Sequence, residues 1–400
     1  MMEKRGGALG GGEEENRYLK IQRSIYSDGG GWLRGSLLGE GGFGSVFVAI
    51  LPDQPRPRQF RDYPSLLAVK SAWSSSSAEL TMEKLVYDRL GSSPHIIKCY
   101  GHDYTLPEDY ERSPRSGEVI LNVFLENAFG GSLRSLIKRS SATGLRESQA
   151  RAHTRSVLRG LELIHQKGFV HCDLKPANIL LVPCDDDNHY GVDGFVAKIA
   201  DLGLAKRSHM HRQSKSKRKA VRGTLMYLSP EAVLENMQEQ ASDIWALGCV
   251  VLEMLTGSLP WDKRLEKEEL LRKIGTETPA LPFFLTKTAR DFLVKCFTRN
   301  PNERPSAEML LTHPFAMESL VKPQELQQVL LQLSAFNKDI GHYHHHRHHQ
   351  IINNDDDDFI PLGETESGCK DEEEEVQVVS AAHHIQIMPV ALMHLHTQDR

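Results

Sequence analysis

Short apolar runs separated by polar turns fill the first part of the chain, beginning near Trp32. The runs that read as β-strands are 32–39, 45–50, 65–70, 96–101 and 119–126. One stretch among them, 77–90, has helical spacing, with Leu80, Leu85 and Val86 as its candidate buried positions. The pattern therefore predicts a small β-sheet with one helix.

Beyond Gly130 and Gly131 the apolar positions change to longer helical periods. The segment 149–166 places Val157, Leu158, Leu161 and Ile164 at three- and four-residue steps, which predicts an amphipathic helix. The segment 242–257 is apolar nearly all round, which is typical of a helix buried in the centre of a lobe. These patterns predict a second lobe that is mainly helical and ends near 312–315.

Low-complexity sequence flanks this central part. Residues 1–31 are rich in Gly and Glu and predict a flexible leader, while 316–400 form an acidic, His-rich tail that we expect to be disordered. Pro, Gly and charged residues mark 53–64, 104–118 and 183–194 as surface loops.

Composition narrows the class of protein. Hydrophobic residues make up 40% of the chain and charged residues 25%, as in ordinary soluble domains. The most apolar run, 244–252, is far shorter than the ~20 residues of a spanning helix, so we expect no membrane insertion. Without an apolar stretch for secretion near the N-terminus, we expect a cytosolic or nuclear protein. The six cysteines form no CxxC pair, so we expect reduced thiols.

Charge divides the chain in two. From Met317 to Arg400 there are 15 acidic and 5 basic side chains, a net charge of −10, whereas the remainder carries +5. The tail and the central part are therefore chemically distinct segments.

A glycine-rich element, GEGGFGSV, occupies 39–46. Such a pattern occurs in dinucleotide-binding folds, where it opens a helix, but here a strand-like run follows it. The glycines are therefore expected at the tip of a β-hairpin. Glycine at that place lets backbone N–H groups approach triphosphate oxygens without a Cβ in the way.

Lys70 ends the apolar run 65–70. A lone lysine at a strand end usually faces water, but Glu83 on the predicted helix can supply a carboxylate that holds it against nucleotide phosphates. Glu79, one turn earlier, is the rival partner. The spacing of Glu83 to the apolar positions that follow favours Glu83.

Two loops carry further polar chemistry. In His171-Cys172-Asp173-Leu174-Lys175-Pro176-Ala177-Asn178, the Asp and the Asn are spaced to place a carboxylate on a substrate hydroxyl and an amide oxygen on a magnesium ion. Asp201, after the strand-like run before it, supplies a second carboxylate. The two loops together could hold metal and phosphate.

In this order and at these intervals the chain resembles a eukaryotic protein kinase over about 32–315. The resemblance also rests on GTLMYLSPE at 223–231, on Asp243 and on Arg304. It implies an α+β, bilobal protein kinase fold, with a small β-rich N-lobe (32–126) that has one helix and a larger, mainly helical C-lobe (127–315). It further implies that Asp243 braces the catalytic loop and that Arg304 pairs with Glu231.

The resemblance implies ATP and Mg²⁺ as cofactors and a role for each matched residue. The residues implied to bind the nucleotide are Gly39, Gly41, Gly44, Val46, Ala68, Lys70, Glu83, Glu126 and Ala128, with Leu125 as gatekeeper and 126–128 as hinge. Asn178 and Asp201 would bind magnesium, and Asp173 would position and deprotonate the attacking hydroxyl. Lys175, together with Thr224, is typical of serine/threonine kinases.

Among kinases, GEGGFGSV, LENAFGGSL and GTLMYLSPEAV are most similar to plant MEKK-like mitogen-activated protein kinase kinase kinases. This resemblance implies MAP kinase kinases as protein substrates, and we expect no nucleic acid partner. The chain departs from the usual pattern at Cys172, where Arg is usual, at Leu202, where Phe is usual, and at Pro176, where that group usually has Gly. Pro176 leaves open a serine/threonine kinase of another pathway. A pseudokinase scaffold is disfavoured because the whole implied catalytic set is present.

Cys172 affects the expected regulation. In kinases with Arg at this place, the cation binds a phosphate on the activation segment. A thiol cannot supply that charge, so we expect phosphorylation to matter less than usual at Ser208, Ser214 and Ser216. The interval 206–222 has eight Lys or Arg and no acidic residue, which fits either a solvated loop or a patch for acidic segments.

Overall fold

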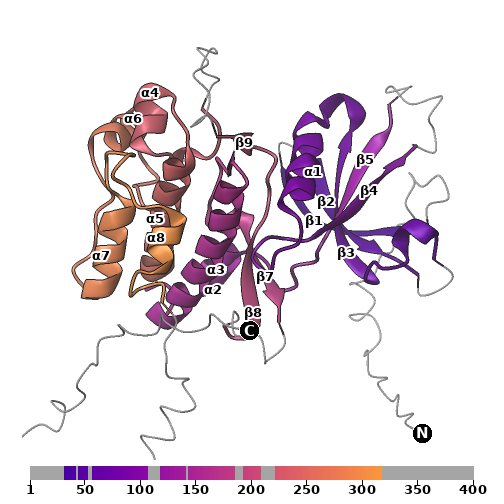
Figure 1. Cartoon of the computed structure of the whole chain (residues 1–400), viewed down its shortest axis with the longest axis horizontal. Coiled ribbons are helices and arrows are strands. Elements are labelled where there is room, and N and C mark those ends of the chain that lie inside the picture. Colours follow the sequence, from indigo (N-terminus) through magenta and orange to yellow (C-terminus); the bar gives the residue numbers. More distant parts are fainter. Residues whose placement is uncertain are drawn as a thin grey trace, which may run out of the picture. The chain divides into compact units, whose positions relative to one another are not determined.

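The computed structural model describes residues 31–41, 44–52, 56–106, 118–140, 143–184, 192–208 and 221–317 (Figure 1). The chain divides into two units, Met1–Leu320 and Val321–Arg400, and all described residues belong to the first. Apart from Gly31, Ala316 and Met317, the predicted leader and tail lie outside the described residues.

One antiparallel sheet of five strands forms the N-terminal lobe, in the order β1-β2-β3-β5-β4. The strands are β1 (Leu33–Gly41), β2 (Gly44–Ile50), β3 (Leu66–Trp73), β4 (Cys99–Thr105) and β5 (Ile120–Leu125). Their positions confirm the predicted sheet, although the fourth strand starts later than the apolar run 96–101. Ile96 instead lies opposite Ile199 of the C-terminal lobe, where Ile97 N donates to Ile199 O and Ile199 N donates to His95 O, both at 2.9 Å.

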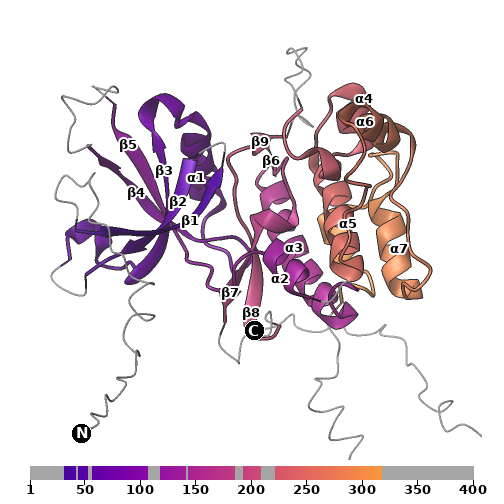
Figure 2. The ribbon, with the colours of Figure 1, turned by 180° about the vertical axis from the view of Figure 1, so that it is seen from behind.

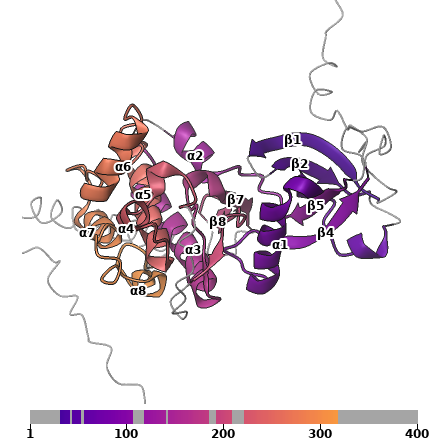
Figure 3. The same cartoon turned by 90° about the horizontal axis from the view of Figure 1, so that it is seen from above.

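The single helix of this lobe, α1 (Ala78–Leu90), packs on the sheet against β3, β4 and β5 (Figure 3). Its buried side chains are Leu80, Glu83, Val86, Tyr87 and Leu90. The prediction that Leu85 is buried is wrong, since 42% of this side chain is exposed. The buried stripe follows three- and four-residue steps from Leu80, and Leu85 lies off that stripe.

A second apolar cluster covers the other face of the sheet, and it includes Phe60 from the segment predicted as a surface loop. Phe60 sits in a short 3-10 turn (Arg58–Phe60), is 1% exposed and packs edge-on against Phe124 with ring centroids 5.4 Å apart. The prediction of a loop that lies wholly on the surface is therefore wrong. One aromatic among Pro and Arg residues gives no periodic signal that would have revealed its burial.

The C-terminal lobe is mainly helical, as predicted (Figures 1 and 2). Its helices are α2 (Leu133–Arg139), α3 (Glu147–Gln166), α4 (Pro230–Glu235), α5 (Gln240–Thr256), α6 (Lys267–Thr276), α7 (Lys287–Cys296) and α8 (Ala307–Leu311). The lobe also contains two short antiparallel strand pairs: β6 (Phe169–Val170) with β9 (Lys206–Arg207), and β7 (Ile179–Pro183) with β8 (Phe195–Ile199). The α+β, two-lobed fold class is confirmed.

Helix α5 is the centre of this lobe. Every residue from Ser242 to Leu255 is buried, as the nearly uniform apolar sequence predicted. Gly248 allows α7 to approach closely, since a Cβ at this position would lie 2.8 Å from Cys296. Gly257 ends the helix in the left-handed conformation with φ 68°.

A buried ion pair joins Arg304 to Glu231 of α4, and Arg304 also donates to Ala241 O of α5 at 2.6 Å. Arg304 Nη1 lies 2.8 Å from Glu231 Oε1 and Nη2 lies 3.0 Å from Oε2, with side chains 0% and 3% exposed. Burial alone would raise the pKa of Glu231, but the hydrogen bonds and charge of Arg304 hold it below its ordinary value. The pair is therefore ionised, and each partner compensates the buried charge of the other.

We predict that Arg304→Met lowers the stability of the domain by about 3–5 kcal/mol, because Glu231 would be left buried without its cation. Thermal unfolding should show a midpoint lower by roughly 10 °C. Arg264→Met is the matched control, since Arg264 pairs with Asp262 while remaining 83% exposed. An equal fall in melting temperature for both variants would contradict the structural role of the buried pair.

We also predict a pH dependence that arises from His153 of α3, which is 2% exposed. Burial lowers its pKa to about 4, although the charge of Asp193 acts in the opposite direction. Between pH 4 and the ordinary pKa of about 6.5, only the unfolded chain binds this proton, so stability should fall as pH decreases. The slope from one such group is at most about 1.4 kcal/mol per pH unit.

The variant His153→Gln should therefore have a shallower loss of unfolding free energy between pH 6 and pH 4.5, measured by urea denaturation at each pH. His95, whose pKa burial also lowers to about 4, should contribute to the slope that remains, as should carboxylates with lowered pKa such as Asp243. Identical slopes for the variant and the unmodified chain would refute the prediction.

Candidate active site

The glycine element lies where β1 turns into β2, with Gly39 opposite Val46 and Gly41 opposite Gly44. Residues 42 and 43 lie outside the described part. Gly44 is required by the fold itself, since its φ is 128° and a Cβ would lie 2.5 Å from Ser71 O. At Gly39 a Cβ would meet nothing within 4 Å. Internal packing therefore does not explain glycine there, which fits a role toward a ligand.

Lys70 of β3 is the most constrained cation of the site. Its Nζ lies 2.6 Å from Glu83 Oε2 of α1 and 2.9 Å from Asp201 Oδ1, which follows β8. The structure thus brings together three residues that the sequence singled out, from both lobes. Glu79, the rival partner, instead lies beside Gly203, with its Cβ 3.7 Å from the Cβ that an alanine would have there.

The opposite charges of Lys70 and Asp201 keep both groups ionised, although burial favours their neutral forms. Burial alone would lower the pKa of Lys70, but the charges of Glu83 and Asp201 raise it above its ordinary value. Burial likewise would raise the pKa of Asp201, and the Lys70 ammonium holds it below its ordinary value. Glu83 is 1% exposed, and burial raises its pKa. Lys70 is therefore protonated and Asp201 ionised at neutral pH.

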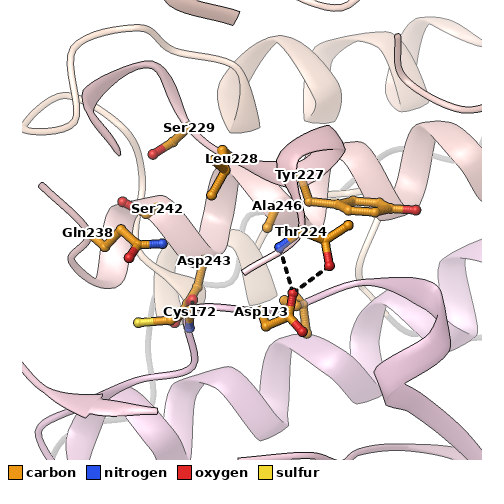
Figure 4. A pocket seen from close by; sticks show the side chains of 11 residues that line it. Cys172, Asp173, Thr224, Tyr227, Leu228, Ser229, Gln238, Ser242, Asp243 and Ala246 are labelled. Atoms are coloured by element: carbon orange, nitrogen blue, oxygen red, sulfur yellow. Dashed lines mark hydrogen bonds between the residues drawn. The ribbon is translucent and has the colours of Figure 1, made fainter. Parts of the chain in front are cut away.

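Asp173 lies at the meeting point of two segments. Its Oδ1 accepts hydrogen bonds from Thr224 N at 2.9 Å and Thr224 Oγ1 at 2.8 Å (Figure 4). Its Oδ2 lies 2.7 Å from Lys175 Nζ, which also donates to Thr224 Oγ1 at 2.8 Å. Both carboxylate oxygens are thus oriented. The hydrogen bond from Thr224 N also holds the backbone of the motif 223–231 against Asp173.

Asn178 is oriented by the same carboxylate. Its Nδ2 donates to Asp173 O at 2.9 Å and to Asp173 Oδ2 at 3.1 Å, so its amide oxygen points away from Asp173. Ala200 N donates to Asn178 O at 2.9 Å, which places Asp201 beside this loop. Pro176 opens the 3-10 turn Pro176–Asn178, a position that proline favours, so its departure from the usual glycine is compatible with the loop.

The donor set at Asn178 and Asp201 fits magnesium. One carboxylate and one amide oxygen leave most of the coordination shell to phosphate oxygens and water, as Mg²⁺ prefers. Within the described ranges, no group of three or more His, Cys, Asp or Glu could hold a metal ion by itself. A cation at this place would therefore need oxygens from the nucleotide.

Asp243 of α5 holds the backbone of the loop that contains Asp173. Its carboxylate accepts from His171 N at 2.8 Å, Cys172 N at 3.0 Å and His165 Nε2 at 2.9 Å. Burial alone would raise the pKa of Asp243, but the bond from His165 and the charges nearby hold it below its ordinary value. Cys172 has a left-handed φ of 69°, and this carboxylate stabilises the unusual backbone.

Cys172 contributes no charge to its surroundings. Its side chain is 7% exposed, and burial raises the pKa of the thiol well above its ordinary value. It lines a cavity of about 10 Å³ together with Asp173, Thr224 and Asp243 (Figure 4). That is roughly the space for one water molecule, so the cavity is not a substrate site. The five cysteines of the described part are all free thiols.

The predicted hinge lies between the lobes, after β5. Leu125 is 8% exposed and pairs with Ala68 across β3 and β5. Val46 and Ala128 pack against the main hydrophobic core. Among the described residues, the backbone N–H of Ala128 has no backbone partner, while its carbonyl accepts from Gly131 N at 2.9 Å.

One contact of the hinge was missed by the sequence reasoning. The Glu126 carboxylate binds Lys198 of β8, with distances of 2.7 and 2.9 Å from Nζ to the two oxygens. Lys198 lies three residues before Asp201, so this pair ties the hinge to β8, the strand that leads to Asp201. A lysine in a short strand gives no sequence signal of such a partner.

Comparisons with known proteins agree with this geometry. The protein kinase domain family model matches residues 32–316. Mitogen-activated protein kinase kinase kinase 20 of Arabidopsis thaliana is 43% identical over 288 residues, which are 71% of this chain and 78% of that protein. Mitogen-activated protein kinase kinase kinase 17 of the same plant is 35% identical over 289 residues, covering 71% and 69% of the two chains.

The similarity extends beyond plants. Mitogen-activated protein kinase kinase kinase A of Dictyostelium discoideum is 32% identical over 295 residues, covering 72% of this chain and 28% of that protein. In the part of the chain that the structure describes, no helix is long and apolar enough to cross a membrane.

The family model and the relatives show that the chain belongs to the protein kinase family, as a serine/threonine kinase of the mitogen-activated protein kinase kinase kinase group that takes phosphate from ATP.

Proposed function

We propose that this kinase transfers the γ-phosphate of magnesium-bound ATP to serine and threonine hydroxyls of MAP kinase kinases. The observation that carries the proposal is the Asp173 carboxylate, oriented by Thr224 and Lys175, in the same site as the Lys70–Asp201 pair. The substrate class follows the names of the relatives, which are kinases of MAP kinase kinases.

Asp173 acts on the attacking hydroxyl. Its carboxylate orients the serine or threonine of the substrate and accepts the proton that leaves as the new oxygen–phosphorus bond forms. Lys175 lies 2.7 Å from the same carboxylate, and its positive charge stabilises negative charge that develops on the transferred group. Thr224 fixes the rotation of the carboxylate through its two hydrogen bonds to Oδ1.

The phosphates are held by groups from both lobes. Gly39, Gly41 and Gly44 would cover them with backbone N–H groups, and Lys70 would contact them while Glu83 keeps its ammonium in place. Asn178 and Asp201 would hold Mg²⁺, which neutralises phosphate charge when bound. Their side chains come from loops that Ala200 N links directly, so the two ligands keep a fixed separation.

We predict that Lys70→Met and Asp201→Asn each reduce phosphate transfer at least about 100-fold, because they remove phosphate positioning and metal binding. Both variants should remain folded. The pKa of Glu83 is already raised by burial, so this carboxyl can take up a proton once its partner is gone. Transfer from labelled ATP measures the effect, and circular dichroism checks the fold.

Lys267→Met is the matched control, since Lys267 is an exposed lysine at the start of α6. It should retain the unmodified rate. Equal labelling of substrate by the unmodified chain and by Asp201→Asn would contradict the proposed role of Asp201 as a metal ligand.

A panel of catalytically inactive MAP kinase kinases, with other kinases' protein substrates as controls, tests the substrate class. We expect phosphate on serine and threonine of MAP kinase kinases, identified by mass spectrometry, and none on tyrosine. Efficient labelling of the control substrates with no labelling of any MAP kinase kinase would assign the enzyme to another pathway.

A further inference from the structure

The Glu239 carboxylate binds Lys206 and Ser208, which lie at the start of the activation segment, the stretch that begins after Asp201 and ends with the motif 223–231. Glu239 precedes α5, and its Oε1 lies 3.4 Å from Lys206 Nζ of β9. Its Oε2 accepts a hydrogen bond from Ser208 Oγ at 2.7 Å. The Glu239 and Lys206 side chains are 21% and 25% exposed, so the contact is shielded from water on most sides.

This contact connects the activation segment to the catalytic loop. Strands β6 and β9 lie side by side (Figure 2). Lys206 pairs with Val170, directly before His171, and Ser208 N donates to Gly168 O at 2.9 Å. On its other side, Glu239 N donates to Ser242 Oγ at 3.2 Å, in the first turn of α5. The same helix supplies Asp243 to the catalytic loop. Glu239 therefore joins the segment to the element that holds the loop.

Two cations gather around the uncharged Cys172. Lys206 and Arg222 both lie close enough to act on the pKa of its thiol, as does the Glu239 carboxylate. Arg222 is fixed by Gln238, which accepts from Arg222 N at 3.0 Å and donates to Arg222 O at 2.8 Å. In a kinase with Arg in place of Cys172, cations at this place would meet a phosphate of the activation segment. Here an acid of the chain itself occupies that environment.

We propose that Glu239 replaces an activation-segment phosphate and that Ser208 is a phosphorylation site at which a phosphate would displace Glu239 and lower the activity. The inference concerns regulation and rests on the proposed role of Asp173 in transfer. In the modification, the Ser208 Oγ–P bond forms, the bond from the γ-phosphorus to the ADP oxygen breaks, and the hydroxyl proton leaves to solvent.

The sign of the effect follows from charge. The Ser208 hydroxyl donates to Glu239, whereas a phosphate carries nearly two negative charges and only accepts. Two acids at this distance repel each other, and both would compete for the Lys206 ammonium. Glu239 would leave Lys206, and β9 would lose its connection to α5. Phosphorylation at Ser208 should therefore inhibit.

The test is a double-mutant cycle of Ser208→Asp and Glu239→Gln in the full chain. The readout is kcat/KM for transfer from ATP to a catalytically inactive MAP kinase kinase. We expect each single variant to be about 3- to 10-fold less active, since the ion pair is partly exposed. The double variant should recover most of that loss, because one acid again faces Lys206. Additive losses, or an unaffected Ser208→Asp variant, would overturn the proposal.

Hydrogen exchange of the amides of 206–208 gives a readout that does not depend on phosphate transfer. Both single variants should exchange faster than the unmodified chain, and the double variant should be protected again. Unchanged exchange in Glu239→Gln would also overturn the inference. If the unmodified chain labels no MAP kinase kinase, the substrate proposal fails while exchange still tests the contact.

Glu268→Gln is the matched control, because Glu268 is an exposed glutamate in the first turn of α6. It should change neither kcat/KM nor exchange at 206–208. Ser208→Ala removes one hydrogen bond without adding charge, so we expect less than about a threefold effect on kcat/KM. A loss in Ser208→Ala as large as in Ser208→Asp would show that charge is not the cause and would overturn the proposal.

Discussion

The ammonium of Lys70 is the interaction on which the rest of the site depends. It contacts Glu83 of α1 and Asp201 after β8, so one cation joins the sheet, its helix and the C-terminal lobe. A buried carboxylate without a partner is costly, and Glu83 is 1% exposed. The position of α1 on the sheet and the presence of Lys70 are therefore coupled. The same pairing places Asp201, the proposed metal ligand, next to the cation that would meet the phosphates.

The catalytic loop is likewise held by a buried charged side chain, the carboxylate of Asp243. Asp243 accepts hydrogen bonds from the backbone of His171 and Cys172, where the chain takes a left-handed turn that costs energy on its own. The acid is carried by α5, which is buried along nearly its whole length and therefore has little freedom to move. Behind it, the Glu231–Arg304 pair fixes the segment that follows Thr224. Burial thus restricts the motion of α5 and its neighbours, and the hydrogen-bonded and paired charges offset the free-energy cost of burying Asp243 and Glu231.

The departures from the usual kinase pattern are each compatible with this framework. Pro176 starts a 3-10 turn, where a fixed φ is an advantage. Leu202 is fully buried and fills an apolar position of the core. Cys172 removes a charge but keeps the backbone bond to Asp243. The missing charge changes what the neighbouring cations bind, and Glu239 is the acid that meets Lys206 there.

The sequence by itself determined the strands of the sheet, the helices α1, α3 and α5, and the order of the catalytic motifs. Alternating or helical periods and glycine or proline breaks are local signals, and they located the five strands of the sheet and the buried helix α5. Spacing also favoured Glu83 over Glu79 as the partner of Lys70, which the structure bears out.

Only the tertiary structure decided which distant side chains meet. It buried Phe60 and paired Glu126 with Lys198, although neither outcome has a periodic signal. The contact between Glu239 and Ser208 joins residues 31 positions apart. Such pairings depend on how β9 and α5 pack, because the free energy of a charge pair is set by distance and burial, and neither quantity is a local property of the chain.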